Sequence, residues 1–355
     1  MNHQRIAIYL QKNRVLFLAL VTVLIALLPV SGSAEEANLN FYVTPEFPDS
    51  QVEGSTSYFD LNLEPGATES LTLTLQNASD EPIQVRITPH TAYTNVHGVV
   101  EYGKDAEEVD PTLPYALDEI IESPEVIDLA GNETKTVDVA LHMPQASFDG
   151  FLAGGLRISE VKEESEEEPT DEEGVAIKNE FAYVIGVIVS NSRNAVKPDL
   201  ELLDVFADQL NYRNVISATI QNFTPTFVNR MAVEATVQRV GEEDILYEAS
   251  EEMMQMAPNS HFHFPISLEG DRFVAGDYLL KLTATSGEEE WSWERAFTIE
   301  TDEARSFNRA DVTIEDGLNW WWIAALSVIV LLAGVLFYVL YEQKKAAASE
   351  ETKEE

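Results

Sequence analysis

Alternating apolar and polar residues predict β-strands along most of this chain. Residues 71–75 (LTLTL) and 83–87 (IQVRI) alternate strictly, and a third run of this kind covers residues 136–143. Because successive side chains of a strand point to opposite faces, each run would bury one face and leave the other in water. Residues 181–189 are nearly all apolar, which predicts a strand buried on both faces. Asn, Asp, Gly and Pro separate these runs, so the pattern predicts antiparallel sheets packed as a sandwich.

The alternation returns after a polar bridge at residues 190–194. It predicts a second set of strands, the clearest of which cover residues 215–222, 231–240, 278–284 and 291–299. Six or seven strands within about 100 residues are typical of an immunoglobulin-like sandwich. We therefore predict an all-β fold with two tandem immunoglobulin-like β-sandwiches, over residues 35–194 and 195–301, followed by a polar linker at 302–319.

A longer apolar run near the C-terminus breaks the alternation. Residues 320–341 carry no charge, and they have three tryptophans at one end and Tyr338 and Tyr341 near the other. As a helix this run would span the ~30 Å hydrocarbon core of a membrane, with its aromatic rings at the two interfaces. It predicts one transmembrane helix followed by a short tail at 342–355; a buried core helix is the alternative.

The beginning of the chain predicts export. Arg5, Lys12 and Arg14 precede an apolar run at 15–30, and small residues follow at 31–34. This order is typical of a secretory signal peptide, here residues 1–34, although an uncleaved signal anchor is possible. The lysines after residue 341 place the tail in the cytoplasm. The expected location is the cell membrane, crossed once, with the N-terminus outside after cleavage and the exported part facing the cell wall.

Charge and cysteine content narrow the possible functions. The formal net charge is −40, and there are no cysteines. Such acidity argues against binding to nucleic acid or to an anionic membrane surface through charge, and it suits either cationic partners or simple solubility. The absence of cysteine removes thiol catalysis and Cys-based metal sites, and it fits a Gram-positive surface better than an animal ectodomain.

Two features could hold a metal, but neither predicts one. Residues 160–173 are crowded with acids, which favours a mobile loop over a calcium site because the spacing of an EF-hand loop is missing. His261 and His263 would share one face of a strand, yet no third ligand is indicated nearby. We expect no metal and no cofactor.

Catalytic motifs are also missing. The sequence has no Gly-x-Ser-x-Gly, His-Glu-x-x-His or Walker pattern, and its carboxylates are too numerous for any pair to stand out. We predict a protein that is not an enzyme and has no catalytic residue. An acidic cell-wall hydrolase and a membrane-anchored solute-binding or adhesion receptor are the alternatives.

Two stretches carry more specific information. Residues 148–156 bring three glycines into an apolar strand region, which indicates a bulge, a bend or the close approach of another backbone. Residues 253–266 concentrate methionine and phenylalanine. Methionines there would fill the core or offer adaptable contact area to another protein.

These stretches belong to an ordered series of motifs. In the first half of the chain they are FYVTP at 41–45, YFDL at 58–61, LEPG at 63–66, the strand and turn at 71–80, YTN at 93–95 with Gly98, MP at 143–144, FDG at 148–150, GG at 154–155 and YVIGV at 183–187. In the second half they are NVI at 214–216, MQMAPNS at 254–260, FPI at 264–266, AGDY at 275–278, and Trp291, Trp293 and Phe297.

In this order of motifs the chain resembles the WxL-interacting proteins of Gram-positive bacteria. The resemblance implies a membrane-anchored scaffold whose N-terminal domain binds peptidoglycan and whose C-terminal domain binds WxL-domain surface proteins. The extreme acidity and the 160–173 segment depart from the family.

On this basis, candidate binding residues can be named. For peptidoglycan they are Tyr93, Thr94 and Asn95, because tyrosine can stack on sugars and asparagine can pair with amides; a structural turn is the alternative. For the protein partner they are Met253, Met254, Met256, Phe262 and Phe264, with a core role as the alternative.

Overall fold

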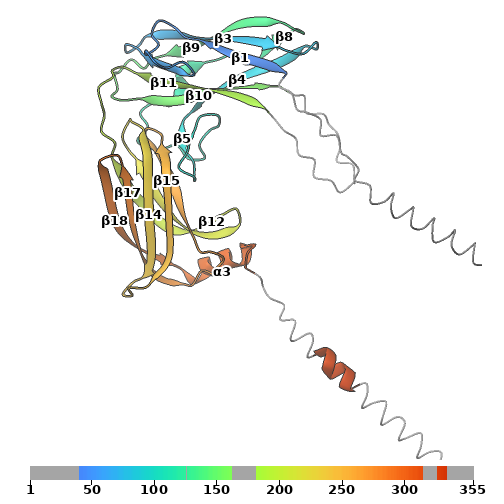
Figure 1. The fold of residues 1–355 in the computed structure, drawn as a ribbon, viewed down its shortest axis with the longest axis vertical. Helices are drawn as coiled ribbons and strands as arrows, with labels where there is room; N and C mark the ends of the chain where they lie inside the picture. The colour runs from blue at the N-terminus through green and yellow to red at the C-terminus, as the bar shows by residue number, and fades with distance from the viewer. Residues whose placement is uncertain (1–39, 125, 162–180, 315–325, 334–355) are drawn as a thin grey trace, which may run out of the picture.

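The protein is built almost entirely of β-sheet (Figure 1). The computed structural model describes residues 40–124, 126–161, 181–314 and 326–333. The predicted signal peptide, nearly all of the acidic segment and the tail lie outside these ranges. The predicted all-β class is confirmed for the part of the chain that the structure describes.

Two sheets face each other in the first half of the chain. One has the order β1-β3-β9-β7, with the strands β1 (Phe41–Glu46), β3 (Thr68–Asn77), β9 (Thr134–His142) and β7 (Ile121–Glu122). The other has the order β2-β11-β10-β4-β8, with β2 (Phe59–Asn62), β11 (Ala182–Ser190), β10 (Leu152–Glu160), β4 (Ile83–Thr91) and β8 (Ile127–Leu129). All of these pairings are antiparallel except that of β2 with β11.

The predicted alternation creates the core of this first sandwich. Leu71, Leu73 and Leu75 of β3 are fully buried, while the threonines between them face outward. Side chains of β10 and β11 pack on the same core from the opposite sheet. Residues 83–87 and 136–143 also expose one face, as predicted.

Strand β11 departs from the prediction of burial on both faces. Its inward residues, such as Val187, are buried, but Ala182 is exposed and Val184 is 47% exposed. The prediction was wrong because apolar side chains on the outer face are covered only in part. Tyr58 packs over Gly186, and Ile188 joins a small separate cluster.

A segment inserted between β4 and β7 extends toward the second half of the chain. It contains the short strands β5 (Tyr93–Thr94) and β6 (Val100–Glu101) and the one-turn helix α2 (Leu117–Ile120). Figure 1 shows β5 between the two sandwiches.

The second half also forms two facing sheets. One has the order β12-β13-β16, with β12 (Leu200–Leu210), β13 (Arg213–Asn222) and β16 (Ser260–Ser267). The other has the order β15-β14-β17-β18, with β15 (Ile245–Met256), β14 (Val228–Arg239), β17 (Gly276–Ser286) and β18 (Glu289–Ile299). Every pairing is antiparallel, and one apolar core lies between the two sheets.

The segment predicted to be a polar linker begins with a helix, α3 (Thr301–Ala310). A capping box between Glu300 and Glu303 starts it, and Ala304 is buried against the second core. The ring of Phe307 lies 5.7 Å from that of Phe273. The linker prediction missed α3 because its few apolar residues fall on one narrow stripe.

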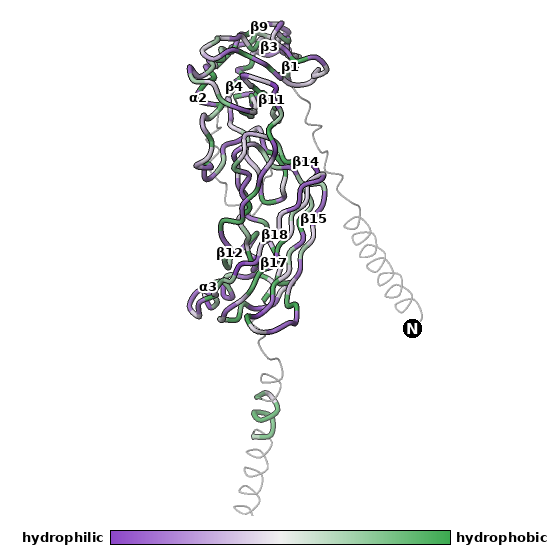
Figure 2. Tube along the Cα trace, turned by 90° about the vertical axis from the view of Figure 1, so that its left-hand side faces the viewer, coloured by the Kyte–Doolittle hydropathy of each residue, from purple (hydrophilic) through white to green (hydrophobic). Residues whose placement is uncertain are grey.

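The apolar C-terminal run is described only at residues 326–333, which are helical and exposed. Figure 2 shows this short helix as hydrophobic. Within the described ranges, no helix is both long enough and apolar enough to cross a membrane.

Candidate functional site

A hollow lies where the two sandwiches meet. It is a cavity of about 750 Å³, lined mostly by residues 91–119 of the inserted segment and closed on the other side by residues 259–263. Residues far apart in the sequence therefore meet here, including parts of both predicted binding regions. We take this junction cavity as the candidate functional site.

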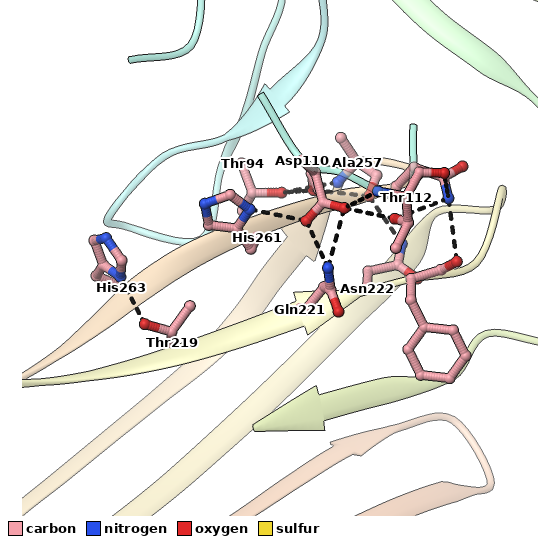
Figure 3. A network of polar contacts seen from close by, with 12 residues as sticks. Thr94, Asp110, Thr112, Thr219, Gln221, Asn222, Ala257, His261 and His263 are labelled. Atoms are coloured by element: carbon pink, nitrogen blue, oxygen red, sulfur yellow. Dashed lines mark hydrogen bonds and ion pairs between the residues drawn. The ribbon is translucent and has the colours of Figure 1, made fainter. Parts of the chain in front are cut away.

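An ion pair crosses the junction beside the cavity (Figure 3). The His261 Nδ1 donates to the Asp110 Oδ2 at 2.8 Å, and the Gln221 Nε2 donates to both carboxylate oxygens at 3.0 and 2.9 Å. Asp110 belongs to the inserted segment, whereas Gln221 lies on β13 and His261 on β16. Only 2% of the Asp110 side chain is exposed, so this carboxylate is held almost wholly by protein groups.

The surroundings shift the pKa values of both partners. Burial by itself would raise the pKa of Asp110, but hydrogen bonds from His261, Thr112 and Gln221 outweigh it and hold that pKa at about 2. The hydrogen bond to Asp110 raises the pKa of His261, although burial opposes this. Asp110 is therefore a carboxylate and His261 tends to be an imidazolium, so the contact is a true ion pair in mildly acidic solution.

Further polar contacts reinforce the junction. The Thr94 and Ser260 hydroxyls lie 2.6 Å apart, and the Ala257 N–H donates to the Thr94 Oγ1 at 3.0 Å. The Asn259 Nδ2 donates to the Thr112 carbonyl at 3.0 Å. The Asn259 Oδ1 is buried and has no hydrogen-bond partner within the described structure.

Apolar contacts complete the junction, and one of the glycines at 148–156 lies against the backbone of the second sandwich. A small cluster joins Ala92, Val100 and Ala153 to Ala257 of the second sandwich. Gly150 has φ +69°, and a Cβ there would lie 2.0 Å from the Pro225 carbonyl oxygen. The predicted close approach of another backbone is confirmed at this position, where only glycine fits without a shift.

The predicted peptidoglycan residues have unequal access to solvent. Thr94 is buried at the junction, and the Asn95 Oδ1 accepts hydrogen bonds from the N–H groups of His97 and Val99. Asn95 therefore organises a turn. Tyr93 is half-buried and lines the cavity beside Lys104. Contact of these residues with peptidoglycan stays a prediction.

The predicted partner residues are mostly in the core. Four of them, Met254, Met256, Phe262 and Phe264, are buried in the core of the second sandwich. Met253 instead is 73% exposed on β15. Their binding role stays a prediction, but only Met253 can touch a partner without opening the core.

The histidine pair has protein partners. His261 binds Asp110, and the His263 Nδ1 lies 2.9 Å from the Thr219 hydroxyl. Their rings are 6.2 Å apart. Across the described ranges, no three potential metal ligands lie together.

Three junction residues were missed in the sequence: Asp110, Gln221 and Asn259. Asp110 follows Glu107 and Glu108 and precedes a proline. This pattern predicts a turn at Asp110, but it does not predict that the carboxylate is buried. Gln221 lies in the predicted strand at 215–222 and Asn259 in the motif at 254–260, but neither pattern marks a polar side chain that will be buried. Their polar groups matter only because the fold brings residues 111 and 147 positions apart into contact.

Comparisons with known proteins match each half of the chain to a family. Residues 41–160 match the family model described as the peptidoglycan binding domain of WxL Interacting Protein. Residues 172–309 match the model described as the host binding domain of the same protein. No curated protein matches.

Several solved structures are similar at low identity. The YadV chaperone is 12% identical with a TM-score of 0.29, covering 74% of this chain and 100% of its own. The E. coli chaperone DraB is 14% identical with a TM-score of 0.26, covering 67% of this chain and 94% of its own. The CsuC–CsuE complex of Acinetobacter baumannii is 13% identical with a TM-score of 0.29, covering 72% of this chain and 98% of the matched chain. Likeness at this level carries no functional information.

Proposed function

The chain belongs to the family of WxL-interacting proteins, and from this premise we propose that it is a non-enzymatic scaffold that tethers WxL-domain proteins to the cell envelope. The first sandwich would bind peptidoglycan and the second a WxL-domain protein. The observation that carries the proposal is the match of two binding-domain families, one to residues 41–160 and the other to residues 172–309.

The folded architecture supports this division. Each sandwich has its own apolar core, and the second packs a sheet of order β12-β13-β16 against one of order β15-β14-β17-β18. Seven antiparallel strands in two sheets support the immunoglobulin-like type. We infer two domains, residues 35–194 and 195–301, both of the immunoglobulin-like type. Their large exposed sheet surfaces suit binding, and the matched families are binding domains.

Peptidoglycan binding can be tested by sedimentation. The full-length chain is mixed with purified peptidoglycan, the pellet is quantified, and the supernatant is assayed for released sugar or peptide fragments. A scaffold sediments with the polymer and releases nothing. A chain left in the supernatant would refute wall binding, whereas soluble fragments that increase with time would indicate a hydrolase.

Partner binding is tested with the same full-length chain as bait. Proteins that co-purify with it from cell-envelope extracts are identified by mass spectrometry. The proposal expects exported proteins with Trp-x-Leu motifs, enriched over a bait of similar acidity. Enrichment of proteins without such motifs would place the partner in another class.

The proposed location is the outer face of the cell membrane. It is supported by the basic and apolar start at residues 1–34 and by the uncharged run at 320–341. Protease added to cells without their wall should cut the two sandwiches and spare the tail at 342–355. Protection of the sandwiches would reverse this topology.

A further inference from the structure

We propose that the junction cavity binds a side chain with an aliphatic stem and a terminal ammonium group, carried by a diamino acid in the stem peptides of peptidoglycan. This inference rests on the proposed wall binding and assigns it a site and a ligand chemistry. Most of the cavity lining comes from the sandwich that matches the peptidoglycan-binding family.

The charge of the cavity suits a cation. Six carboxylates line it, and three of them already have close partners within the protein. Asp105 bonds to His90, Asp110 to His261, and Asp118 to the Thr91 hydroxyl.

The other three carboxylates belong to Glu107, Glu108 and Glu119. They are exposed and form no ion pair with another described residue. Glu107 already acts on Lys104 and Glu108 on His261 through charge, but none of the three carboxylates is held by a described ion pair. An ammonium group in the cavity could therefore join them without breaking an existing ion pair.

The one lysine of the cavity is held by the protein itself. The Lys104 Nζ lies 3.9 Å from the Glu101 Oε2. The pKa of Lys104 is raised, chiefly by its hydrogen bond with Tyr93 and further by the charge of Glu101. Lys104 is exposed, so its charge is well solvated and opposes a second cation only weakly.

The walls of the cavity suit an aliphatic stem. Val96, Ala106, Val109, Leu113 and Ala116 all line it, and Val109 is 64% exposed. Apolar side chains and carboxylates that line one cavity together complement a methylene chain that ends in an ammonium group.

Asn259 supplies an independent observation. Its side chain lines the cavity and is 95% buried, since only 5% of the residue is exposed. Its Nδ2 donates hydrogen bonds to the carbonyl groups of Thr112 and Phe223. Its Oδ1, however, accepts no hydrogen bond in the described structure. A buried acceptor without a donor is costly, so a ligand N–H group that displaced the atoms covering this oxygen would be stabilised by it.

The test compares purified peptidoglycan with the same material after acetylation of its free amines. The full-length chain should bind the acetylated polymer about tenfold more weakly, which corresponds to about 1.4 kcal/mol. That loss is the size expected for a few partly exposed charge contacts. Stem peptides released by an amidase should compete for binding, and glycan strands freed of peptide should not.

A triple variant tests the residues. Glu107→Gln, Glu108→Gln and Glu119→Gln together should reproduce the tenfold loss on untreated peptidoglycan and remove the effect of acetylation. The matched control is Glu242→Gln, Glu243→Gln and Glu248→Gln, which changes the charge equally at exposed positions on the β14–β15 side of the second sandwich. This control should bind like the unchanged chain.

The outcomes separate the site from the function. Equal binding of the unchanged chain to acetylated and untreated peptidoglycan overturns the amine site but leaves wall binding intact. If both triple variants lose the same amount of binding to peptidoglycan, the loss reflects net charge alone, and this result also overturns the site. Failure of the unchanged chain to bind untreated peptidoglycan refutes the proposed wall binding itself. The acetylation comparison uses unaltered protein, so it decides the matter even if a variant folds poorly.

Discussion

At the scale of single residues, Asp110 and His261 decide how firmly the two sandwiches are joined. The pair is nearly buried, and Gln221 binds both oxygens of the carboxylate. Breaking a buried pair by removing one charge leaves the other uncompensated. One substitution at Asp110 or His261 should therefore destabilise the junction more than many substitutions on the surface.

The first prediction concerns Asp110→Asn. This change removes the negative charge that pairs with His261 and should lower the free energy of unfolding by about 3 kcal/mol at pH 6, as measured by denaturant titration. The matched control is Asp105→Asn, since Asp105 also pairs with a histidine but its side chain is 76% exposed. The control should change stability by less than about 1 kcal/mol. Similar losses for both variants would contradict a special role for the buried pair.

The same pair predicts a pH dependence of stability. The pKa of Asp110 falls from 3.8 to about 2 on folding, so its contribution is present above about pH 4 and is lost as the pH falls toward 2. The pKa of His261 is raised above 6.5, so its contribution is full below about pH 6 and is lost as the pH rises through the raised value. Glu108, which also faces His261, adds to that rise.

The measurement is the thermal midpoint of the full-length chain and of His261→Gln across pH 3 to 9. The difference between the two should be largest between about pH 4 and 6 and should shrink on the alkaline side. A difference that stays constant across this range would show that the charge on His261 contributes nothing.

Neighbouring methionines give a third prediction. Met254→Ala removes a core side chain and should lower the free energy of unfolding by about 2–4 kcal/mol, with unchanged affinity for a WxL-domain protein in the folded fraction.

Met253→Ala removes an exposed side chain, so it should leave the free energy of unfolding within about 0.5 kcal/mol of the unchanged chain. If Met253 is a main contact with the partner, the affinity of this variant for the WxL-domain protein should fall about thirtyfold. Unchanged affinity for Met253→Ala would exclude this residue as a partner contact.

At the scale of elements, strands were predictable and their surroundings were not. Strict alternation at residues 71–75 and 83–87 identified β3 and β4 because a half-buried strand imposes a period of two. The apolar run at residues 181–189 predicted strand β11 but not that its outer face is partly exposed. That exposure depends on which side chains pack over the outer face, and these come from other parts of the chain. The junction could not be predicted, because its contacts join residues that only the fold brings together.

Helix α3 carries the fourth prediction. Phe307 packs against Phe273 and so holds the helix on the second sandwich. Phe307→Ala should lower the free energy of unfolding by about 2 kcal/mol, measured by denaturant titration. Arg305→Ala on the exposed side of the same helix serves as the control and should cost less than about 0.5 kcal/mol. Equal effects would mean that α3 is not docked through Phe307.

At the scale of the whole molecule, a rigid junction would fix the direction in which the two binding domains point. The polar network and the apolar cluster around Ala257 join the sandwiches through side chains and backbone alike. A scaffold gains from such stiffness, because two sites held at a fixed separation can bind together at a lower entropic cost.

A three-component sedimentation measurement tests whether this protein links WxL-domain proteins to peptidoglycan. A WxL-domain protein is mixed with purified peptidoglycan, and the full-length chain is added in increasing amounts. We expect the chain to sediment and to carry additional WxL-domain protein into the pellet, in a saturable and stoichiometric manner and with no release of soluble wall fragments. An amount of pelleted WxL-domain protein that does not change as the chain is added would contradict the proposal that this protein links the two.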